Sequence, residues 1–370
     1  MILDTQDLLL LRLAGEYRQI PLHSLSILGF ASLRDAAARL TAAELLSIPR
    51  GGSYFRLAPK GCELMSRLGR PQEPSTRRTY EGDPTLRRRL NIGSVMLTCL
   101  RAGIDTALDG VDGLREQPAF YPAFALRNGG TNLMNAASCA GFAHLGDAAY
   151  MLQYVGADSR GMYLDNELRQ LHNMSSVFGE NLNIPKAVIF AGDSYAHLYE
   201  RVHTAILPPK QSRHGYTDYA EVYRLADIPI HLLPCDEAGA FQLAVMSETE
   251  YIAKLARAAF GDRWKPADPD IPEADGSVSG TPLVIGVDMN VRRVEAVLAA
   301  AKNLGRREVM VAALKEQMRD FYLAALPKGK FVTPLGIGED VLEVAFGKRL
   351  TLYTPPRDPA RDESGAFVYA

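Results

Sequence analysis

Apolar residues near the start of the chain follow a helical spacing in three successive segments, and each segment is bounded by a capping or turn residue. The first segment follows Asp4 or Thr5, either of which can cap a helix. Pro21 favours the start of a second, shorter helix. The third segment runs from Ser32, a residue type common at helix N-caps, to about Leu46. We therefore predict three helices within this segment.

Beyond the third helix the pattern changes to that of extended chain. Two short apolar runs within residues 47–57 flank Gly51-Gly52, which is typical of a β-hairpin. Residues 59–61 close the hairpin and begin a last helix, which we expect from Cys62 to Leu68. The predicted order of helix, helix, helix, hairpin and helix is that of a winged helix-turn-helix domain.

This segment resembles the third helix and wing of winged-helix proteins. The resemblance is carried by residues 38–40, by Leu45-Leu46 and by the run YFRLAPKG at residues 54–61. It is most similar to the replication-relaxation family of plasmids and mobile elements, in which a YxLTxKG wing follows the recognition helix. Ala58 stands where that family usually has Thr, and the third helix is poorer in arginine than in many DNA binders. The resemblance is confined to residues 1–68 and implies a DNA-binding domain.

A winged helix of this kind binds DNA with a small set of side chains. The third helix presents its N-terminal residues to base edges, while the wing and nearby amides bind phosphate. We expect Arg34 and Arg39 to read guanine or bind phosphate, and Ser32 to bind phosphate at the helix N-terminus. The wing adds candidates for phosphate or minor-groove contacts: Arg50, Tyr54, Arg56 and Lys60. The alternative is that these charges are solvated on a domain that contacts only proteins.

The charge of the N-terminal segment supports DNA binding, whereas the net charge of the whole chain does not. The whole chain has 41 basic and 43 acidic residues, a net charge of −2, which does not indicate a nucleic-acid binder. Residues 1–90 hold 14 basic and 9 acidic residues, a net charge of +5. A second basic cluster, Arg87-Arg88-Arg89, opens a predicted helix and either extends the phosphate contact or is a solvated helix start.

The remainder of the chain alternates between strand-like and helix-like patterns, which favours a mixed α/β fold (α+β overall). Strands are expected at residues 150–155, 186–191, 228–233, 240–246, 283–287 and 308–312, and helices at 91–107, 166–174, 194–205 and 291–301. The expected organisation is a winged helix (1–68), a linker (69–90), an α/β domain (91–262), an acidic Pro-rich exposed loop (263–282), an α/β continuation or small domain (283–353) and a tail (354–370). We expect the tail to be disordered apart from any docking of Phe367 and Tyr369.

Motifs for catalysis are incomplete. Metal nucleases of the type associated with replication-relaxation proteins need an acidic residue two positions before a lysine, and none of the ten lysines has one. Asp193-Ser194 resembles the nucleophile block of GDSL/SGNH hydrolases, but no histidine follows an Asp-x-x pattern to activate the serine. We expect Asp193-Ser194 to cap a helix instead. Residues 283–288 resemble the start of a nucleotide-binding unit but no glycine-rich phosphate loop follows. We therefore assign no catalytic residue, metal or cofactor.

The cysteines and the apolar runs bear on the compartment. The four cysteines form no CxxC pair, which indicates reduced, buried thiols in a cytoplasmic protein: Cys62, Cys99, Cys139 and Cys235. No apolar run is long enough to span a membrane. The sequence predicts a homodimeric, sequence-specific binder of double-stranded DNA, a transcriptional regulator or a replication or transfer accessory factor of a mobile element. Its α/β part would dimerise, sense a ligand or dock a protein. The alternative is an enzyme, a degenerate nuclease-like or SGNH-like hydrolase.

Overall fold

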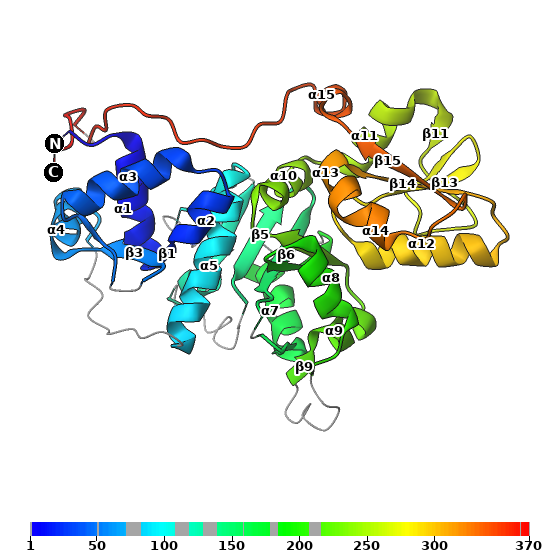
Figure 1. The fold of residues 1–370 in the computed structure, drawn as a ribbon, viewed down its shortest axis with the longest axis horizontal. Coiled ribbons are helices and arrows are strands. Elements are labelled where there is room, and N and C mark those ends of the chain that lie inside the picture. The colour runs from blue at the N-terminus through cyan, green and yellow to red at the C-terminus, as the bar shows by residue number, and fades with distance from the viewer. Residues whose placement is uncertain are drawn as a thin grey trace. The chain divides into compact units, whose positions relative to one another are not determined.

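The chain forms two compact units, each built from helices and strands (Figure 1). The computed structural model describes residues 2–49, 52–71, 83–107, 118–128, 139–157, 159–177, 184–206, 216–362 and 364–369. Unit 1 comprises residues 1–101, 235–237 and 353–370, and unit 2 comprises residues 102–234 and 238–352. The protein is thus a mixed α/β chain with several sheets.

Unit 1 opens with helices around a small antiparallel sheet in which β3 lies between β1 and β2. Its elements are α1 (Thr5–Tyr17), β1 (Ile20–Pro21), α2 (Leu22–Ile27), α3 (Ala31–Ala42), β2 (Leu46–Ser47), β3 (Tyr54–Leu57) and α4 (Pro59–Arg67). Asp4 forms a capping box with Asp7 at the start of α1, and Pro59 occupies the first turn of α4. The predicted helices and hairpin are confirmed.

The bounds of α3 differ from the predicted ones. Ser32 does not cap the helix, because Phe30 occupies the N-cap position and the helix already begins at Ala31. The helix ends at Ala42 instead of Leu46, since Glu44 takes a positive φ of 62° and turns the chain into β2. An apolar pattern alone does not define the terminal residues of a helix.

Two further segments belong to unit 1 and depart from the expected boundaries. Helix α5 (Pro84–Arg101) begins inside the segment expected to be a linker, and Ser94 of this helix hydrogen-bonds Ser24 of α2 at 2.9 Å. The tail returns to the first residues of the chain, so that both ends lie together in Figure 1. The Leu3 N–H donates to the Val368 carbonyl at 3.0 Å, and both side chains are buried. The expected disorder of the tail is therefore wrong for its described residues.

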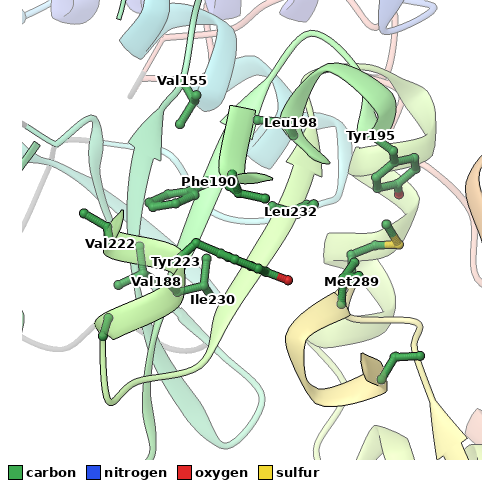
Figure 2. Packing of buried hydrophobic residues seen from close by; sticks show 14 of the residues in the cluster. Val155, Val188, Phe190, Tyr195, Leu198, Val222, Tyr223, Ile230, Leu232 and Met289 are labelled. Atoms are coloured by element: carbon green, nitrogen blue, oxygen red, sulfur yellow. The ribbon is translucent and has the colours of Figure 1, made fainter. Parts of the chain in front are cut away.

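The first sheet of unit 2 has the strand order β10-β8-β6-β5-β4. The three strands β4, β5 and β6 are antiparallel, whereas β6, β8 and β10 run parallel. The bounds of its strands and surrounding elements are β4 (Ala119–Pro122), α6 (Ala123–Asn128), β5 (Gly141–Leu145), β6 (Ala148–Tyr154), β7 (Gly161–Tyr163), α7 (Leu164–Val177), β8 (Lys186–Gly192), α8 (Tyr195–His203), β9 (Tyr216–Asp218), α9 (Tyr219–Leu225) and β10 (Ile230–Pro234). Figure 2 shows Phe190 of β8 and Leu232 of β10 packed with side chains of α8 and α9.

The second sheet of unit 2 has the order β11-β12-β13-β14-β15, with the last three strands parallel. Figure 1 shows α12 and α14 along one face of these strands and α11 and α15 along the other. The elements are α10 (Glu237–Met246), α11 (Tyr251–Phe260), η3 (Gly261–Arg263), β11 (Trp264–Lys265), β12 (Ser277–Val278), β13 (Thr281–Ile285), α12 (Val291–Asn303), β14 (Val309–Leu314), α13 (Lys315–Gln317), the π-helix η4 (Met318–Tyr322), α14 (Leu323–Ala325), β15 (Val332–Ile337) and α15 (Glu339–Phe346).

Two expectations for this part of the chain are wrong. Residues 240–246 form helix α10 instead of a strand, because a helix that is buried on nearly all sides carries no 3.6-residue pattern. The acidic stretch 263–282 is not an exposed loop throughout, since it supplies β11 and β12 and buries Ile271 and Asp268. Its Asp275 accepts a hydrogen bond from the Ile285 N–H at 2.6 Å and pairs with Arg293.

The remaining predicted elements of unit 2 are confirmed in kind, with bounds that shift by a few residues. The four cysteines are buried and free, as expected. None of the helices in the described residues combines the length and the apolar content that crossing a membrane requires.

Candidate nucleic-acid interface

Helix α3 of unit 1 has one buried face and one exposed face. The buried side chains recur every three to four positions: Leu33, Ala36, Ala37 and Leu40. The exposed residues lie on the opposite face: Ala31, Arg34, Asp35, Ala38 and Ala42. This face is therefore mostly small side chains, with one positive and one negative charge near its N-terminal end.

Arg34 has the position expected of a base-reading side chain. It lies in the first turns of α3 and is exposed. Within the described part of the chain its guanidinium makes no hydrogen bond or ion pair. Ser32, two residues earlier, is half-buried at the same helix end. The structure thus brings Arg34 and Ser32 together at the N-terminus of α3.

Arg39 instead binds α1. Its Nη2 donates to Asp4 Oδ2 at 2.8 Å and to Asp7 Oδ1 at 2.8 Å. Burial raises the pKa of Asp7, and the nearby Arg39 partly opposes that increase. Because the same two aspartates form the capping box of α1, Arg39 joins α3 to the start of α1. The positive charge of Arg39 is therefore largely paired with these two aspartates within the domain.

The wing candidates divide between surface and core. Tyr54 is 3% exposed and lies opposite Pro21 in the sheet, so its ring belongs to the core and offers no DNA contact. Arg56 is half-buried on β3. Lys60 is exposed, and its Nζ donates to the Ala43 carbonyl at 3.1 Å, just beyond the end of α3. Arg50 lies outside the described residues.

The start of α5 adds positive charge next to the wing strands. Arg89 Nη1 donates to Gln19 Oε1 at 3.2 Å, and Gln19 directly precedes β1, which pairs with β3. Arg18, an exposed residue with a φ of 67°, precedes Gln19. Sequence reasoning left the role of residues 87–89 open and missed Arg18, because only the fold brings the start of α5 to β1.

Unit 2 contains a buried polar cluster that sequence reasoning did not find. His231 Nδ1 lies 3.0 Å from the Asp288 carbonyl oxygen and 3.4 Å from Asp288 Oδ2. Arg293 Nη2 lies 3.5 Å from Asp288 Oδ1, and Arg293 also pairs with Asp275. Tyr251 donates to Asp288 Oδ2 at 3.4 Å. His231 and Asp288 are 5% and 3% exposed, so the centre of the cluster, which joins β10 to the segment after β13, is buried, whereas the Arg293 side chain is 17% exposed.

The ionisation states follow from this burial. Burial lowers the pKa of His231 below its ordinary value, although Asp288 opposes the shift. Burial disfavours the charged form of Asp288, but Arg293, His231 and the Asn290 N–H together hold the pKa of that carboxyl below its ordinary value. Burial raises the pKa of Asp275 despite its contact with Arg293. The arrangement is that of a neutral histidine beside an Arg–carboxylate pair.

Elsewhere in unit 2 the hydrolase-like residues serve a structural purpose. The Ser194 hydroxyl accepts from the His197 N–H at 3.2 Å and caps α8, as predicted. Asp193 is exposed and accepts from the Tyr154 hydroxyl at 3.0 Å. Among the residues that the structure describes, no group of three His, Cys, Asp or Glu side chains is arranged to hold a metal ion.

Comparisons with known proteins return no relative. The chain matches no protein-family model, no curated protein and no solved structure.

Proposed function

We infer that the first part of unit 1 is a winged helix-turn-helix domain that binds double-stranded DNA through α3 and the β2–β3 wing. One observation carries this proposal: α1, β1, α2, α3, β2, β3 and α4 follow one another in that order, with β3 paired to both β1 and β2. In winged-helix proteins the third helix enters the major groove and the hairpin lies against the backbone. The same order here leaves one face of α3 exposed.

The exposed face of α3 fits the major groove in size and chemistry. Arg34 is exposed and has no partner among the described residues, so its guanidinium can bind the O6 and N7 atoms of a guanine. Ala31 and Ala38 are small enough to let the helix approach closely, and alanine can contact the methyl group of thymine. Asp35 repels phosphate, so the helix would be held over the bases and away from the backbone on that side.

Phosphate contacts would come from the residues around this helix. Arg56 and Lys60 flank the wing, and Arg18 and the basic start of α5 lie beside β1. The net charge of +5 over residues 1–90 is modest, so one copy would bind weakly. Two copies on paired half-sites would double the phosphate contacts, and we therefore propose a homodimer on DNA.

Unit 2 would serve this DNA binder by dimerising, sensing a ligand or docking a protein. The His231–Asp288–Arg293 cluster connects its two sheets, and His231 and Asp288 at its centre are buried. For the alternative of a nuclease or hydrolase, the described residues hold no group of three His, Cys, Asp or Glu side chains arranged for a metal ion, and Ser194 caps α8. The function that we propose is that of a transcriptional regulator or a replication or transfer accessory factor of a mobile element.

A binding titration with the full chain tests this proposal. Labelled duplexes that tile the DNA around its own coding sequence would be titrated at about 50 mM and 200 mM salt, a range over which phosphate contacts lose much of their affinity. We expect one duplex to bind more tightly than the others at both salt concentrations. Uniform binding that disappears at the higher concentration, or no binding at the lower one, would contradict the proposal.

A further inference from the structure

A groove on unit 1 takes no part in the proposed DNA contact. It has a volume of about 740 Å³ and is lined by α1, by the end of α4 and by the chain's tail. These three segments are far apart in the sequence and meet because residues 358–368 pair with residues 3–5. Pockets for small molecules have volumes of about 300–1,000 Å³, so this groove has the size of a ligand site.

The groove has an apolar floor. Leu8 and Leu9 of α1 are half-buried, and Met65 and Leu68 contribute from the end of α4. Val368 of the tail completes this surface and is itself buried. Half-buried leucines next to a cavity leave apolar area in contact with water, and a ligand with an apolar body would cover it.

The lining is strongly basic. Four arginines take part in it: Arg12, Arg67, Arg70 and Arg361. Asp362 is the acidic residue of the lining; hydrogen bonds from Ser364 and Ala366 to its Oδ1 lower its pKa, so it keeps its negative charge and balances one of the four arginines. Arg67 is exposed and makes no ion pair within the described residues. The groove therefore carries excess positive charge beside its apolar floor.

Arg12 and Arg70 share one carboxylate beside the groove. Arg12 Nε lies 3.6 Å and Arg70 Nη1 lies 3.9 Å from Glu16 Oε1. One carboxylate paired with two guanidinium groups leaves positive charge unbalanced, and a carboxylate or phosphate group of a ligand would neutralise it.

We propose that this groove binds a small molecule with an apolar body and a carboxylate or phosphate group. The apolar part lies on Leu8, Leu9 and Met65, and the anionic group is bound by Arg12 and Arg67. The proposal does not depend on DNA binding by α3.

Two fluorescent probes of similar shape and different charge test the proposed ligand site. We would titrate the full chain with 1-anilinonaphthalene-8-sulfonate, which is anionic, and with N-phenyl-1-naphthylamine, which has the same rings and no charge. We expect one saturable site per chain for the anionic probe and at least tenfold weaker binding of the neutral one. Equal affinity for the two probes, or binding that does not saturate, would overturn the proposal.

Substitutions locate the site. The double variant Arg12→Met and Arg67→Ala keeps the apolar floor, and we expect it to weaken binding of the anionic probe at least tenfold. Arg319→Ala is the matched control, because Arg319 lies on the surface of unit 2 paired with Asp320, and its affinity should stay within twofold of the parent. An unchanged affinity in the double variant, with its circular dichroism spectrum intact, would contradict the assignment.

Displacement of the bound probe separates the two possible anionic groups. Dodecanoate and dodecyl phosphate share an apolar chain, and we expect at least one of them to displace 1-anilinonaphthalene-8-sulfonate competitively. The stronger competitor identifies the group that the arginines prefer. Failure of both to displace the probe would overturn the proposed ligand chemistry.

Discussion

Arg39 of α3 donates a 2.8 Å hydrogen bond to Asp7 of α1, a carboxylate that is only 2% exposed. The same guanidinium nitrogen also reaches Asp4, which caps α1 and lies 3.4 Å from Arg357 of the tail. Three segments of unit 1 therefore meet at one pair of carboxylates. An arginine that the sequence assigns to DNA is, in the fold, a connection between α3, the start of α1 and the tail.

Replacing Arg39 should therefore affect stability more than base recognition. We expect Arg39→Ala to lower the free energy of unfolding by about 1–3 kcal/mol, because it leaves Asp7 buried without its charged donor. Arg34→Ala removes an exposed side chain on the same helix and should change stability by less than about 0.5 kcal/mol. Urea denaturation of both variants measures the difference, and equal midpoints would show that the Arg39 contact contributes nothing.

We expect a larger loss of stability from a substitution in the buried cluster of unit 2 than from Arg39→Ala. Arg293→Met leaves Asp275 and Asp288 without their shared cation, and removing one partner of a buried ion pair costs about 3–5 kcal/mol. Arg319→Ala breaks an exposed pair with Asp320, and solvent screens such a pair, so its stability should stay close to that of the parent. Thermal denaturation compares the two. A melting temperature for Arg293→Met as high as that of Arg319→Ala would exclude a stabilising role for the cluster.

His231 predicts how stability depends on pH. Burial lowers its pKa in the folded chain, so below about pH 6.5 the unfolded chain binds a proton that the folded chain does not. The contribution of His231 to the free energy of unfolding is therefore fully present when the pH lies above its pKa in the unfolded chain. That contribution is lost as the pH falls from there toward its lower pKa in the folded chain. Burial lowers the pKa of His144 in the same direction.

We expect the free energy of unfolding to decrease between pH 7 and pH 5, and to decrease less in His231→Gln. The variant should keep a part of the slope that belongs to His144. Urea titrations at four pH values measure both slopes. Identical slopes of unfolding free energy against pH in the parent and the variant would mean that His231 has the same pKa in the folded and the unfolded chain.

Deleting the tail tests its place in unit 1. A chain that ends at Tyr353 loses the acceptors of two backbone donors, since Leu3 and Thr5 donate to Val368 and Asp358. We expect faster hydrogen exchange at these two amides and unchanged exchange at β8 and β10 in unit 2. Unchanged protection of Leu3 and Thr5 in the truncated chain would show that the tail does not hold them.

The sequence predicted those elements that local signals define. The helix start at Asp4, the hairpin strand β3 and the cap at Ser194 each depend on residues within a few positions of one another. Helix α10 was missed because it is buried on nearly every side and has no periodic polar face. The tail was missed because its partners lie at the other end of the chain, where no local pattern records the pairing.

The candidate site was predicted less completely than the fold. Arg34 was recognised as a surface arginine of the third helix, and the structure leaves it exposed. In the sequence Arg39 looks like Arg34, because both are arginines of the third helix. The two differ in the fold, where Arg39 binds two aspartates. Tyr54 and Arg56 lie two positions apart on β3 and so point to the same face, yet Tyr54 is buried and Arg56 is half-buried, a difference that the strand pattern does not predict. Exposure and pairing, which decide whether a side chain can reach DNA, are properties of the packed domain.

The central claim is that Arg34 on α3 reads DNA. The most direct measurement is fluorescence anisotropy of the tightest-binding labelled duplex with Arg34→Ala and, as control, with Arg319→Ala on unit 2. We expect Arg34→Ala to lose about 1–3 kcal/mol of binding free energy and to discriminate less at one base pair, while the control binds as the parent does. Equal affinity of Arg34→Ala and the parent at matched salt would contradict DNA recognition through α3.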